Sequence, residues 1–502
     1  MIPPITLDNH APTPLYQQLY DDLREAILRG QIRAGTRLPA TRTLAAELLV
    51  SRNTVVNAFD QLLAEGYLEG RVGDGTYVSR ALPEEVLQVR AHAPDAPQLR
   101  GNRALSKRGA LLATTPVRVP RRGGARAFRH GLVALDAFPY EEWARLTARM
   151  WRAPPPELLG YSDPAGYRPL REAIAAYLGA ARGVRCTAEQ VVITAGSQQA
   201  LDLAARILLD PGDAVWMEDP GYLGAKGVLH SAGARLVPVR VDHEGLSIAE
   251  GAARCPEARA AYVTPSHQYP LGVTMSLARR LALLEWAKNS SAWILEDDYD
   301  SEYRYVGRPL AALQGLDQAG RVIYIGTFSK VLLPALRLGY MIVPPDLVDA
   351  FVNARALSDR HAPGIEQAVV AECITSGQFG RHIRQMRTLY AERQAALAEA
   401  ARHALGGLLD IAPAEAGMHL VGWLTDGMDD RAASIQAAEH GIEALPLSAY
   451  AMEPMARGGL LLGYTSVDVP EIRAGVRQLA HALHGMHKEK RAAPSQEGSY
   501  DN

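Results

Sequence analysis

A lysine at position 330 follows a short apolar run, with hydroxyl-bearing residues on its N-terminal side. The run covers residues 322–325, and Arg337 comes seven residues after the lysine. A second apolar run, at 293–295, ends in an acidic segment that contains Asp297. A lysine amine, a carboxylate and an arginine at the ends of neighbouring buried strands are the groups that pyridoxal phosphate requires. The amine forms a Schiff base with the aldehyde, the carboxylate pairs with the pyridinium nitrogen, and the arginine binds the phosphate.

Each candidate side chain takes a definite role around that cofactor. Lys330 would form the Schiff base, because partial desolvation and nearby cationic charge lower its pKa. Asp297 would pair with the pyridinium nitrogen and keep it protonated. Tyr299 would bond the ring hydroxyl, and Tyr222 would stack on the ring face. The phosphate would be held by Ser197, Gln198, Thr327, Ser329 and Arg337.

The elements that position these residues follow from a repeated pattern. Short apolar runs alternate with helix-length segments from about residue 160 onward, which predicts a mainly parallel sheet with helices on both faces, an α/β fold. Ligands of such sheets bind at the carboxyl ends of the strands, where the candidates lie. Ser197 and Gln198 open a helix directly after the run at 191–194, so backbone N–H groups there favour a phosphate.

This set of residues resembles the fold-type I aminotransferases from about Tyr161 to about residue 485. The Thr-Phe-Ser-Lys segment at 327–330 and the downstream Arg-Leu-Gly-Tyr carry the resemblance, together with the segment 161–167. It implies a pyridoxal phosphate-dependent fold with a small C-terminal α+β subdomain. It also implies a dimer with shared sites, in which Tyr161 reaches the phosphate of the partner subunit. Tyr269 stands where the fold usually places an asparagine on the cofactor ring.

The resemblance also raises the question of how a carboxylate would be bound. Working enzymes of this fold clamp the substrate α-carboxylate with an arginine near the C-terminal end, but residues 460–462 are leucines here. Arg457 is the nearest candidate for contact with an effector. If Arg457 does not reach the pocket, an amino acid lacks its bidentate anchor and productive transamination is slow or absent. The domain would then act as a sensor.

The first eighty residues predict three short helices and a hairpin. A helix that begins near Leu15 is stopped by Gly30, a second helix follows Pro39, and Ser51 caps a third. A hairpin with a glycine-rich tip follows at 67–78. Two short helices at a tight turn, followed by a hairpin, indicate a winged helix-turn-helix.

The ordered series from Leu38 to Val78 resembles the winged helix-turn-helix of GntR-family bacterial regulators. The resemblance implies that Arg42, Ser51, Arg52 and Thr54 face DNA and that Gly73 and Gly75 shape a wing. Arg52 is the best candidate for a guanine edge. Ala40 stands where the family usually has serine, which removes one helix cap or phosphate contact.

Charge and composition divide the chain into four segments. The formal net charge is −2 over 502 residues, with −1 in residues 1–80 and +7 in residues 81–129. We expect a DNA-binding domain at 1–80, a basic flexible linker at 81–129, a cofactor-binding effector domain at 130–487 and a disordered tail at 488–502. Such a linker would span roughly 35–45 Å, comparable with one helical turn of DNA at ~34 Å.

Several classes of protein are not expected. Cys186, Cys255 and Cys373 are far apart, which argues against a disulfide framework and against a structural zinc site. His267, His361 and His419 are interpreted as core or surface histidines, so no metal site is expected. No apolar run approaches the ~18 residues of a membrane span, and we expect a cytoplasmic, nucleoid-associated protein without a membrane partner.

The two modules together resemble the MocR subfamily of GntR-type regulators over nearly the entire chain. This implies a transcriptional regulator that binds double-stranded operator DNA and senses pyridoxal phosphate itself or a small amino-compound effector, as a domain-swapped homodimer. The alternative is a catalytically active aminotransferase with an accessory DNA-binding domain. A residual aminotransferase half-reaction is compatible with either interpretation.

Overall fold

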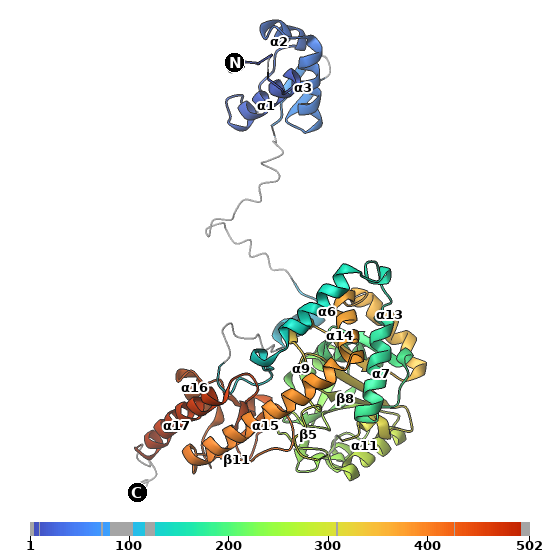
Figure 1. Ribbon diagram of the computed structural model, residues 1–502, viewed down its shortest axis with the longest axis vertical. Coiled ribbons are helices and arrows are strands. Elements are labelled where there is room, and N and C mark those ends of the chain that lie inside the picture. Colours follow the sequence, from blue (N-terminus) through green and yellow to red (C-terminus); the bar gives the residue numbers. More distant parts are fainter. Residues whose placement is uncertain are drawn as a thin grey trace, which may run out of the picture. The chain divides into compact units, whose positions relative to one another are not determined.

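The computed structural model (Figure 1) describes two compact units, residues 1–104 and 105–502. The described residues are 5–9, 11–71, 74–80, 104–115, 126–307, 310–425 and 427–492, of which 487–492 are described as backbone only. None of the helices in these ranges combines the length and the apolar composition needed to cross a lipid bilayer.

The N-terminal unit is a three-helix bundle with a two-stranded wing, as the sequence predicts. Leu19, Val55 and Leu62 are fully buried where the first and third helices pack together. The two strands pair antiparallel, with Leu68 opposite Val78. The elements are α1 (Leu15–Leu28), α2 (Thr41–Glu47), α3 (Arg52–Ala64), β1 (Leu68–Arg71) and β2 (Gly75–Val78).

The helix ends in this unit follow the local sequence. The Ser51 side chain accepts a hydrogen bond from the backbone N–H of Thr54 at 3.1 Å, which caps α3. Ala40, at the corresponding position of α2, provides no side-chain cap. Gly30 follows α1 with φ +72°, a conformation that favours glycine. The predicted cap and stop are therefore confirmed.

The segment predicted as a flexible linker contains ordered structure. Helix α5 (Lys107–Thr114) is capped by Ser106, whose hydroxyl accepts from the N–H of Gly109 at 3.0 Å. Phe128 is fully buried and pairs with Gly463, because an aromatic side chain gains more from burial than from a place in a solvated tether. The linker prediction is therefore wrong for residues 104–115 and 126–129, while 81–103 and 116–125 lie outside the described residues.

The large domain is built on an eight-stranded sheet in the order β3-β10-β9-β8-β7-β4-β5-β6. Neighbouring strands are parallel from β9 through β8, β7 and β4 to β5, while β10 runs antiparallel to both of its neighbours. The mainly parallel sheet is thus confirmed. The strands are β3 (Val191–Thr194), β4 (Ala214–Asp219), β5 (Arg235–Asp242), β6 (Gly245–Leu246), β7 (Ala260–Val263), β8 (Trp293–Asp298), β9 (Val322–Thr327) and β10 (Gly339–Ile342).

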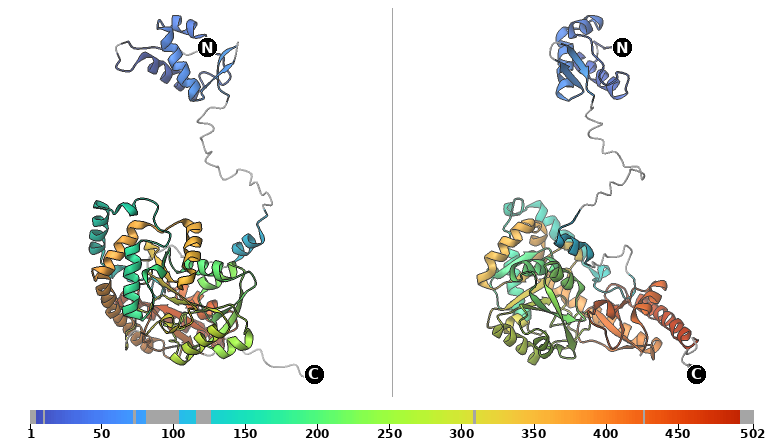
Figure 2. Two further views of the ribbon diagram at one scale, coloured as in Figure 1. Left: turned by 90° about the vertical axis from the view of Figure 1, so that its right-hand side faces the viewer. Right: turned by 180° about the vertical axis from the view of Figure 1, so that it is seen from behind.

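Helices cover both faces of this sheet (Figures 1 and 2). Alternate residues of β4 enter different cores: Val215 and Met217 pack with α8, α9 and α13, and Trp216 packs with α10 and α11. The helices are α6 (Tyr140–Arg152), α7 (Arg168–Arg182), α8 (Ser197–Leu208), α9 (Leu223–Ser231), α10 (Ile248–Arg254), α11 (Leu277–Asn289), α12 (Leu313–Leu316), α13 (Val348–Asp359) and α14 (Gly364–Thr375).

A smaller C-terminal subdomain lies at one side of the large domain, in orange and red in Figure 2. Its antiparallel sheet has the order β11-β12-β14-β13. The predicted tail begins too early, because the last helix continues to Ala492, and residues 493–502 lie outside the described residues. The elements are α15 (Gln378–Ala404), β11 (Leu409–Ile411), β12 (His419–Leu424), α16 (Asp430–Glu439), β13 (Leu445–Pro446), β14 (Gly459–Gly463) and α17 (Val469–Ala492).

Candidate functional site

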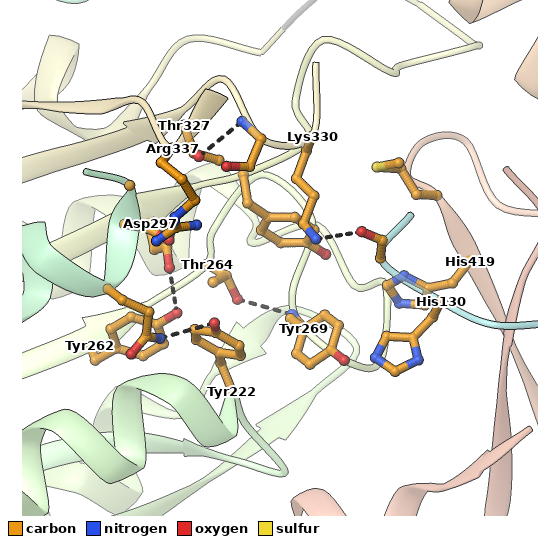
Figure 3. A pocket seen from close by; sticks show the side chains of 17 residues that line it. His130, Tyr222, Tyr262, Thr264, Tyr269, Asp297, Thr327, Lys330, Arg337 and His419 are labelled. Carbon is orange, nitrogen blue, oxygen red and sulfur yellow. Dashed lines mark hydrogen bonds between the residues drawn. The ribbon is translucent and has the colours of Figure 1, made fainter. Parts of the chain in front are cut away.

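A cavity of about 270 Å³ lies where strands β7, β8 and β9 end (Figure 3). The structure brings ten of the sequence-predicted residues to its wall, from loops and helix ends far apart along the chain. They are Ser197, Gln198, Tyr222, Tyr269, Asp297, Tyr299, Thr327, Ser329, Lys330 and Arg337. The edge of the sheet that the sequence points to is therefore the edge where the side chains meet.

Lys330 enters the cavity from the loop that follows β9. Its Nζ donates a hydrogen bond to the carbonyl oxygen of Gly131 at 2.6 Å. Burial lowers the pKa of Lys330, while the negative charges of Asp300 and Asp297 act in the opposite direction. A lowered pKa increases the fraction of neutral amine, which is the nucleophilic form.

Asp297 is the buried carboxylate of the cavity, near the end of β8. Tyr262 donates a hydrogen bond to its Oδ2 at 2.8 Å, but Oδ1 has no hydrogen-bond partner among the described residues. Burial raises the pKa of Asp297 to about 7, against the opposing effect of the Tyr262 hydroxyl. A buried acceptor without a donor is costly, so Oδ1 calls for a donor from a bound molecule. The protonated nitrogen of a pyridinium ring is such a donor.

Gly196, the start of α8 and Arg337 form an anion-binding corner of the cavity. Gly196 has φ +111° and precedes the first turn of α8, whose backbone N–H groups favour negative charge. The Arg337 guanidinium lies 3.5 Å from the Cβ position of Gly196, so the arginine and the start of α8 face the same corner. Arg337 itself has φ +50°, a strained conformation for a non-glycine residue of the kind found at binding sites. Thr327 accepts a hydrogen bond from the N–H of Ser329 at 3.2 Å.

Tyrosine rings form one wall of the cavity. Tyr222 accepts a hydrogen bond from Gln198 Nε2 at 3.0 Å, and its ring meets that of Tyr269 edge to face at 5.8 Å. Tyr269 donates to the hydroxyl of Tyr450 at 3.1 Å. A Cβ at Gly224 would approach Gln198 Nε2 to 2.1 Å, so only glycine leaves room for this contact.

A buried glutamate fixes the loop that carries Tyr269. Glu218 accepts hydrogen bonds from the backbone N–H and hydroxyl of Thr264, at 3.1 and 2.7 Å, and from Gln268 Nε2 at 3.2 Å. The same threonine hydroxyl accepts from the N–H of Tyr269 at 3.0 Å. Burial raises the pKa of Glu218 to about 7. The glutamate is therefore a positioning residue for the tyrosine wall.

Sequence reasoning missed several residues of the wall. These are His130, Gly131, Tyr262, Thr264, Met418 and His419. His130 and Gly131 follow the arginine-rich segment without any motif, and Met418 and His419 come from the C-terminal subdomain. Tyr262 carried a usable signal, because it lies in a predicted strand beside the one that ends in Asp297.

Two of the three histidines interpreted as core or surface residues, His267 and His419, are buried. His267 is buried, and its Nδ1 lies 3.0 Å from Asp300 Oδ2. His419 is buried and also lines the cavity, with Nε2 at 2.9 Å from the carbonyl oxygen of Pro270. Burial, with repulsion from His267 and His130, keeps the pKa of His419 well below its usual value. The neutral ring therefore faces the cavity without adding a cation.

Two predicted residues lie away from the cavity. Tyr161 is 86% exposed, and the guanidinium of Arg360 lies over its ring at 4.9 Å. The expectation for Arg457 is wrong, because its side chain does not reach the cavity. Its guanidinium donates to the carbonyl oxygens of Leu424, at 2.7 Å, and Trp423, at 3.3 Å, which hold it on the C-terminal end of β12.

The candidate DNA-contacting residues lie at the surface of the N-terminal unit. Arg42, Ser51 and Arg52 are exposed and Thr54 is partly exposed, at the start of α2 and α3. Gly75 is exposed with φ +120° at the start of the second wing strand, while Gly73 lies outside the described residues. The side chains at the start of α3 can therefore approach a DNA groove without rearrangement of the core.

Family models match both units of the chain. The model described as bacterial regulatory proteins, gntR family, matches residues 15–78. The model described as aminotransferase class I and II matches residues 134–458. The two matches cover the two modules that the sequence predicts.

Two curated relatives match nearly the whole chain, and a solved aminotransferase matches three quarters of it. The probable rhizopine catabolism regulatory protein MocR of Rhizobium meliloti is 44% identical over 95% of this chain and 96% of its own. The pyridoxine biosynthesis transcriptional regulator PdxR of Corynebacterium glutamicum is 31% identical over 96% of this chain and 98% of its own. The kynurenine aminotransferase of Pyrococcus horikoshii, solved in complex with PMP, is 30% identical with a TM-score of 0.68, over 75% of this chain and 93% of its own.

The donor set of the cavity fits the cofactor that these comparisons indicate. Asp297 offers an unsatisfied acceptor, Lys330 offers an amine of lowered pKa, and Arg337 with the start of α8 offers an anion site. The cofactor is therefore pyridoxal phosphate, and the fold is that of the type I aminotransferases.

Proposed function

The chain belongs to the MocR-type regulators of the GntR family, and on that premise we propose that it binds operator DNA through its winged helix and senses a small molecule in the cavity around Lys330. The sensed molecule is pyridoxal phosphate itself or an amino compound. One observation carries the proposal: a cavity with an unsatisfied Asp297 oxygen is joined, in the same chain, to a recognition helix whose first residues are exposed.

The residues of the cavity divide the work of binding. Pyridoxal phosphate supplies an aldehyde that reacts with amines and a ring that withdraws electrons. Lys330 holds the aldehyde, and Asp297 keeps a proton on the ring nitrogen. Ser197, Gln198, Thr327, Ser329 and Arg337 hold the phosphate; Tyr299 holds the ring hydroxyl; Tyr222 and Tyr269 cover the ring and exclude water.

The assembly that we propose is a domain-swapped homodimer. Tyr161 is exposed and lies away from the cavity of its own chain, which suits a residue that reaches the phosphate in the partner subunit. The solution mass should be that of two chains, and Tyr161→Phe should weaken cofactor retention without changing that mass. A monomer with full cofactor affinity would remove Tyr161 from this role.

The DNA-binding role also supports a location in the cell and a boundary between the DNA-binding and effector-binding domains. A protein that regulates genes acts where the chromosome lies, so we place it in the cytoplasm, associated with the nucleoid. We assign operator contacts to residues 1–80, through Arg42, Ser51, Arg52, Thr54, Gly73 and Gly75, and effector binding to residues 130–487.

The test combines spectroscopy with a DNA shift. The purified chain supplemented with pyridoxal phosphate should develop the visible absorbance of the bound cofactor. It should also shift DNA taken from upstream of its own gene, and an effector or the cofactor should change that affinity. Absence of both the absorbance and the shift would overturn the proposal.

A second function, an active aminotransferase, is favoured by the completeness of the cofactor wall. The distinguishing measurement is the absorbance of the bound cofactor after addition of amino acids. Rapid conversion to the amine form, together with no DNA shift, would favour the enzyme. Slow or absent conversion with a DNA shift favours the regulator, in keeping with the position of Arg457 outside the cavity.

A further inference from the structure

A buried histidine and a buried aspartate form a hydrogen-bonded group with Tyr299 but do not line the cofactor cavity. The side chains of His267 and Asp300 are 2% and 1% exposed. Tyr299 lines the cavity, whereas neither of its two neighbours does. The binding roles assigned above use Tyr299 and leave His267 and Asp300 without a function. The hydrogen bonds of this buried pair reach the cavity through the tyrosine hydroxyl.

One nitrogen of His267 has both partners. Its Nδ1 lies 2.9 Å from the hydroxyl oxygen of Tyr299 and 3.0 Å from Oδ2 of Asp300. An imidazole nitrogen carries either one proton or one lone pair, so the two contacts share the same proton or the same lone pair. The choice between these two states decides whether the Tyr299 hydroxyl donates to the histidine or accepts from it.

Asp300 favours the state with the proton on Nδ1. An ionised carboxylate only accepts hydrogen bonds, so its contact with Nδ1 requires a proton on that nitrogen. Imidazole is a stronger base than a carboxylate, so a proton shared by the two groups resides mainly on nitrogen. Burial raises the pKa of Asp300, and the charge and hydrogen bond of His267 act in the opposite direction.

The second nitrogen of His267 lies against backbone. A Cβ at Gly417 would overlap the imidazole ring, and a Cβ at Gly272 would lie 3.2 Å from Nε2. Nε2 has no hydrogen-bond partner among the described residues. A second proton on the ring would therefore be a buried, charged donor without an acceptor, which is costly. This packing favours a neutral ring that carries its one proton on Nδ1.

A proton on Nδ1 determines what the Tyr299 hydroxyl can do. The tyrosine oxygen accepts from Nδ1–H, so its own proton is available for another acceptor. The hydroxyl has no other hydrogen bond within the part of the chain that the structure describes. Because Tyr299 lines the cavity, a ligand oxygen in that cavity is within its reach. The ring oxygen of the cofactor is such an acceptor.

We propose that His267 and Asp300 are positioning residues: Asp300 holds the proton on His267 Nδ1, and that N–H keeps Tyr299 as a donor to the ring oxygen of the cofactor. This rests on the proposed role of Tyr299 and deepens it. A donor at this oxygen stabilises its ionised form, because hydrogen bonds to a charged acceptor are the stronger ones. The buried pair therefore favours one charge state of the cofactor ring without touching it.

A matched pair of substitutions at one position tests the hydrogen bond on the full-length, cofactor-loaded protein. Asparagine and leucine have the same branched shape, but only the asparagine amide can donate where Nδ1 does. The readout is the ratio of the visible to the near-ultraviolet band of the bound cofactor at one fixed pH. His267→Leu should lower this ratio roughly fivefold, the effect of one hydrogen bond on an equilibrium. His267→Asn should keep it close to the wild-type value, and equal ratios in the two variants would overturn the proposal.

A second comparison asks whether the histidine acts through the tyrosine. Tyr299→Phe should lower the band ratio as much as His267→Leu does. The double variant should show no further fall, because both substitutions remove the same donor from the ring oxygen. A purely structural role of His267 would reduce cofactor retention without changing the ratio. Independent, multiplying effects of the two substitutions would contradict the inferred chain of contacts.

A third variant tests the aspartate and remains informative if His267→Leu does not fold. Asp300→Asn replaces the carboxylate by an amide that can donate to Nδ1, so the nitrogen no longer needs a proton and Tyr299 can donate to it. The band ratio should fall. The control is Glu302→Gln, the same kind of change at a carboxylate that accepts from Tyr177 at 3.1 Å and does not line the cavity. Equal ratios in these two variants would remove Asp300 from its role.

This proposal and the proposed function fail in different ways. A wild-type chain without cofactor absorbance and without a DNA shift refutes the regulator. A wild-type chain that shows both, but whose His267→Leu and Asp300→Asn variants keep the wild-type band ratio, refutes only the positioning role of the buried pair.

Discussion

At the scale of single residues, Lys330 and Asp297 line the same cavity, and their pKa values are shifted in opposite directions. Burial lowers the pKa of the amine and raises that of the carboxyl to about 7, so both groups are held nearer to neutrality than they would be in water. Paired shifts of this kind are common where a bound molecule completes the charge balance. A bound ligand would therefore complete the charge balance and the hydrogen bonding of the cavity.

Lys330→Ala should abolish the visible absorbance of the bound cofactor, because the substitution removes the amine that holds it. Operator binding should persist, since the N-terminal unit has its own core. Lys288→Ala, which removes an exposed lysine from α11, is the control and should retain the absorbance. A persistent band in Lys330→Ala would assign the amine to another residue.

The cofactor-free protein should lose stability as the pH rises from about 4 to about 7. The pKa of Asp297 rises from 3.8 to about 7 on folding, so the folded chain keeps a proton that the unfolded chain has released. Asp297→Asn should reduce this dependence in melting temperatures recorded at pH 5 and pH 8, while Glu218, whose pKa is also raised to about 7, keeps part of it. A slope equal to that of the wild type would show that Asp297 does not titrate in this window.

Arg52→Ala should weaken operator binding by about 1–3 kcal/mol, roughly 5–150-fold, if the guanidinium contacts a base edge. Fluorescence anisotropy with labelled operator measures the change. Arg29→Ala, at an exposed position after α1, is the control and should have a smaller effect. An unchanged affinity for Arg52→Ala would leave Arg52 as surface charge.

The sequence identified residues that belong to local motifs and missed those brought in by tertiary structure. Lys330, Arg337 and Asp297 stand next to predicted strands, so their meeting at one edge followed from the parallel sheet. His130 and His419 come from segments far apart in the chain, and nothing near them signals a cavity. Arg457 failed because proximity in sequence to the usual arginine says nothing about the carbonyl groups that bind it.

At the scale of elements, helix boundaries followed from caps and glycines because these act within one turn. Strand direction was harder to predict: β10 runs antiparallel within a sheet that is otherwise mainly parallel, and its apolar run looks like the others. Helix α5 was missed for a different reason. Its glycine and charged residues resemble a linker, and its significance comes from packing on α9.

Ser51→Ala should loosen the start of α3 by about 1 kcal/mol, because the N–H of Thr54 loses its acceptor. Hydrogen exchange in peptides of α3 should speed up roughly fivefold. Ala40→Ser is the matched experiment, since it adds the missing cap to α2 and should slow exchange there. No change in either variant would show that these caps do not limit local opening.

At the scale of the whole molecule, the division into two modules was predictable from composition, motif order and charge. Their joint could not be placed from sequence, because a basic segment can be a tether or can pack against a domain. The second unit begins at Leu105, so part of the supposed tether belongs to the effector domain. Helix α5 therefore belongs to the second unit, where it packs on α9.

The packing of α5 on the second unit also sets the length of the segment that connects it to the DNA-binding unit. From Arg80 to Ala104 the chain has 24 peptide steps, at most roughly 80–86 Å when pulled straight, whereas 49 steps to Arg129 would reach about twice as far. In the homodimer proposed above, both DNA-binding units could contact more widely separated operator half-sites only after α5 is released from α9. A molecule that stabilises the contact of α5 with α9 would therefore limit the spacing of operator half-sites that the protein can contact.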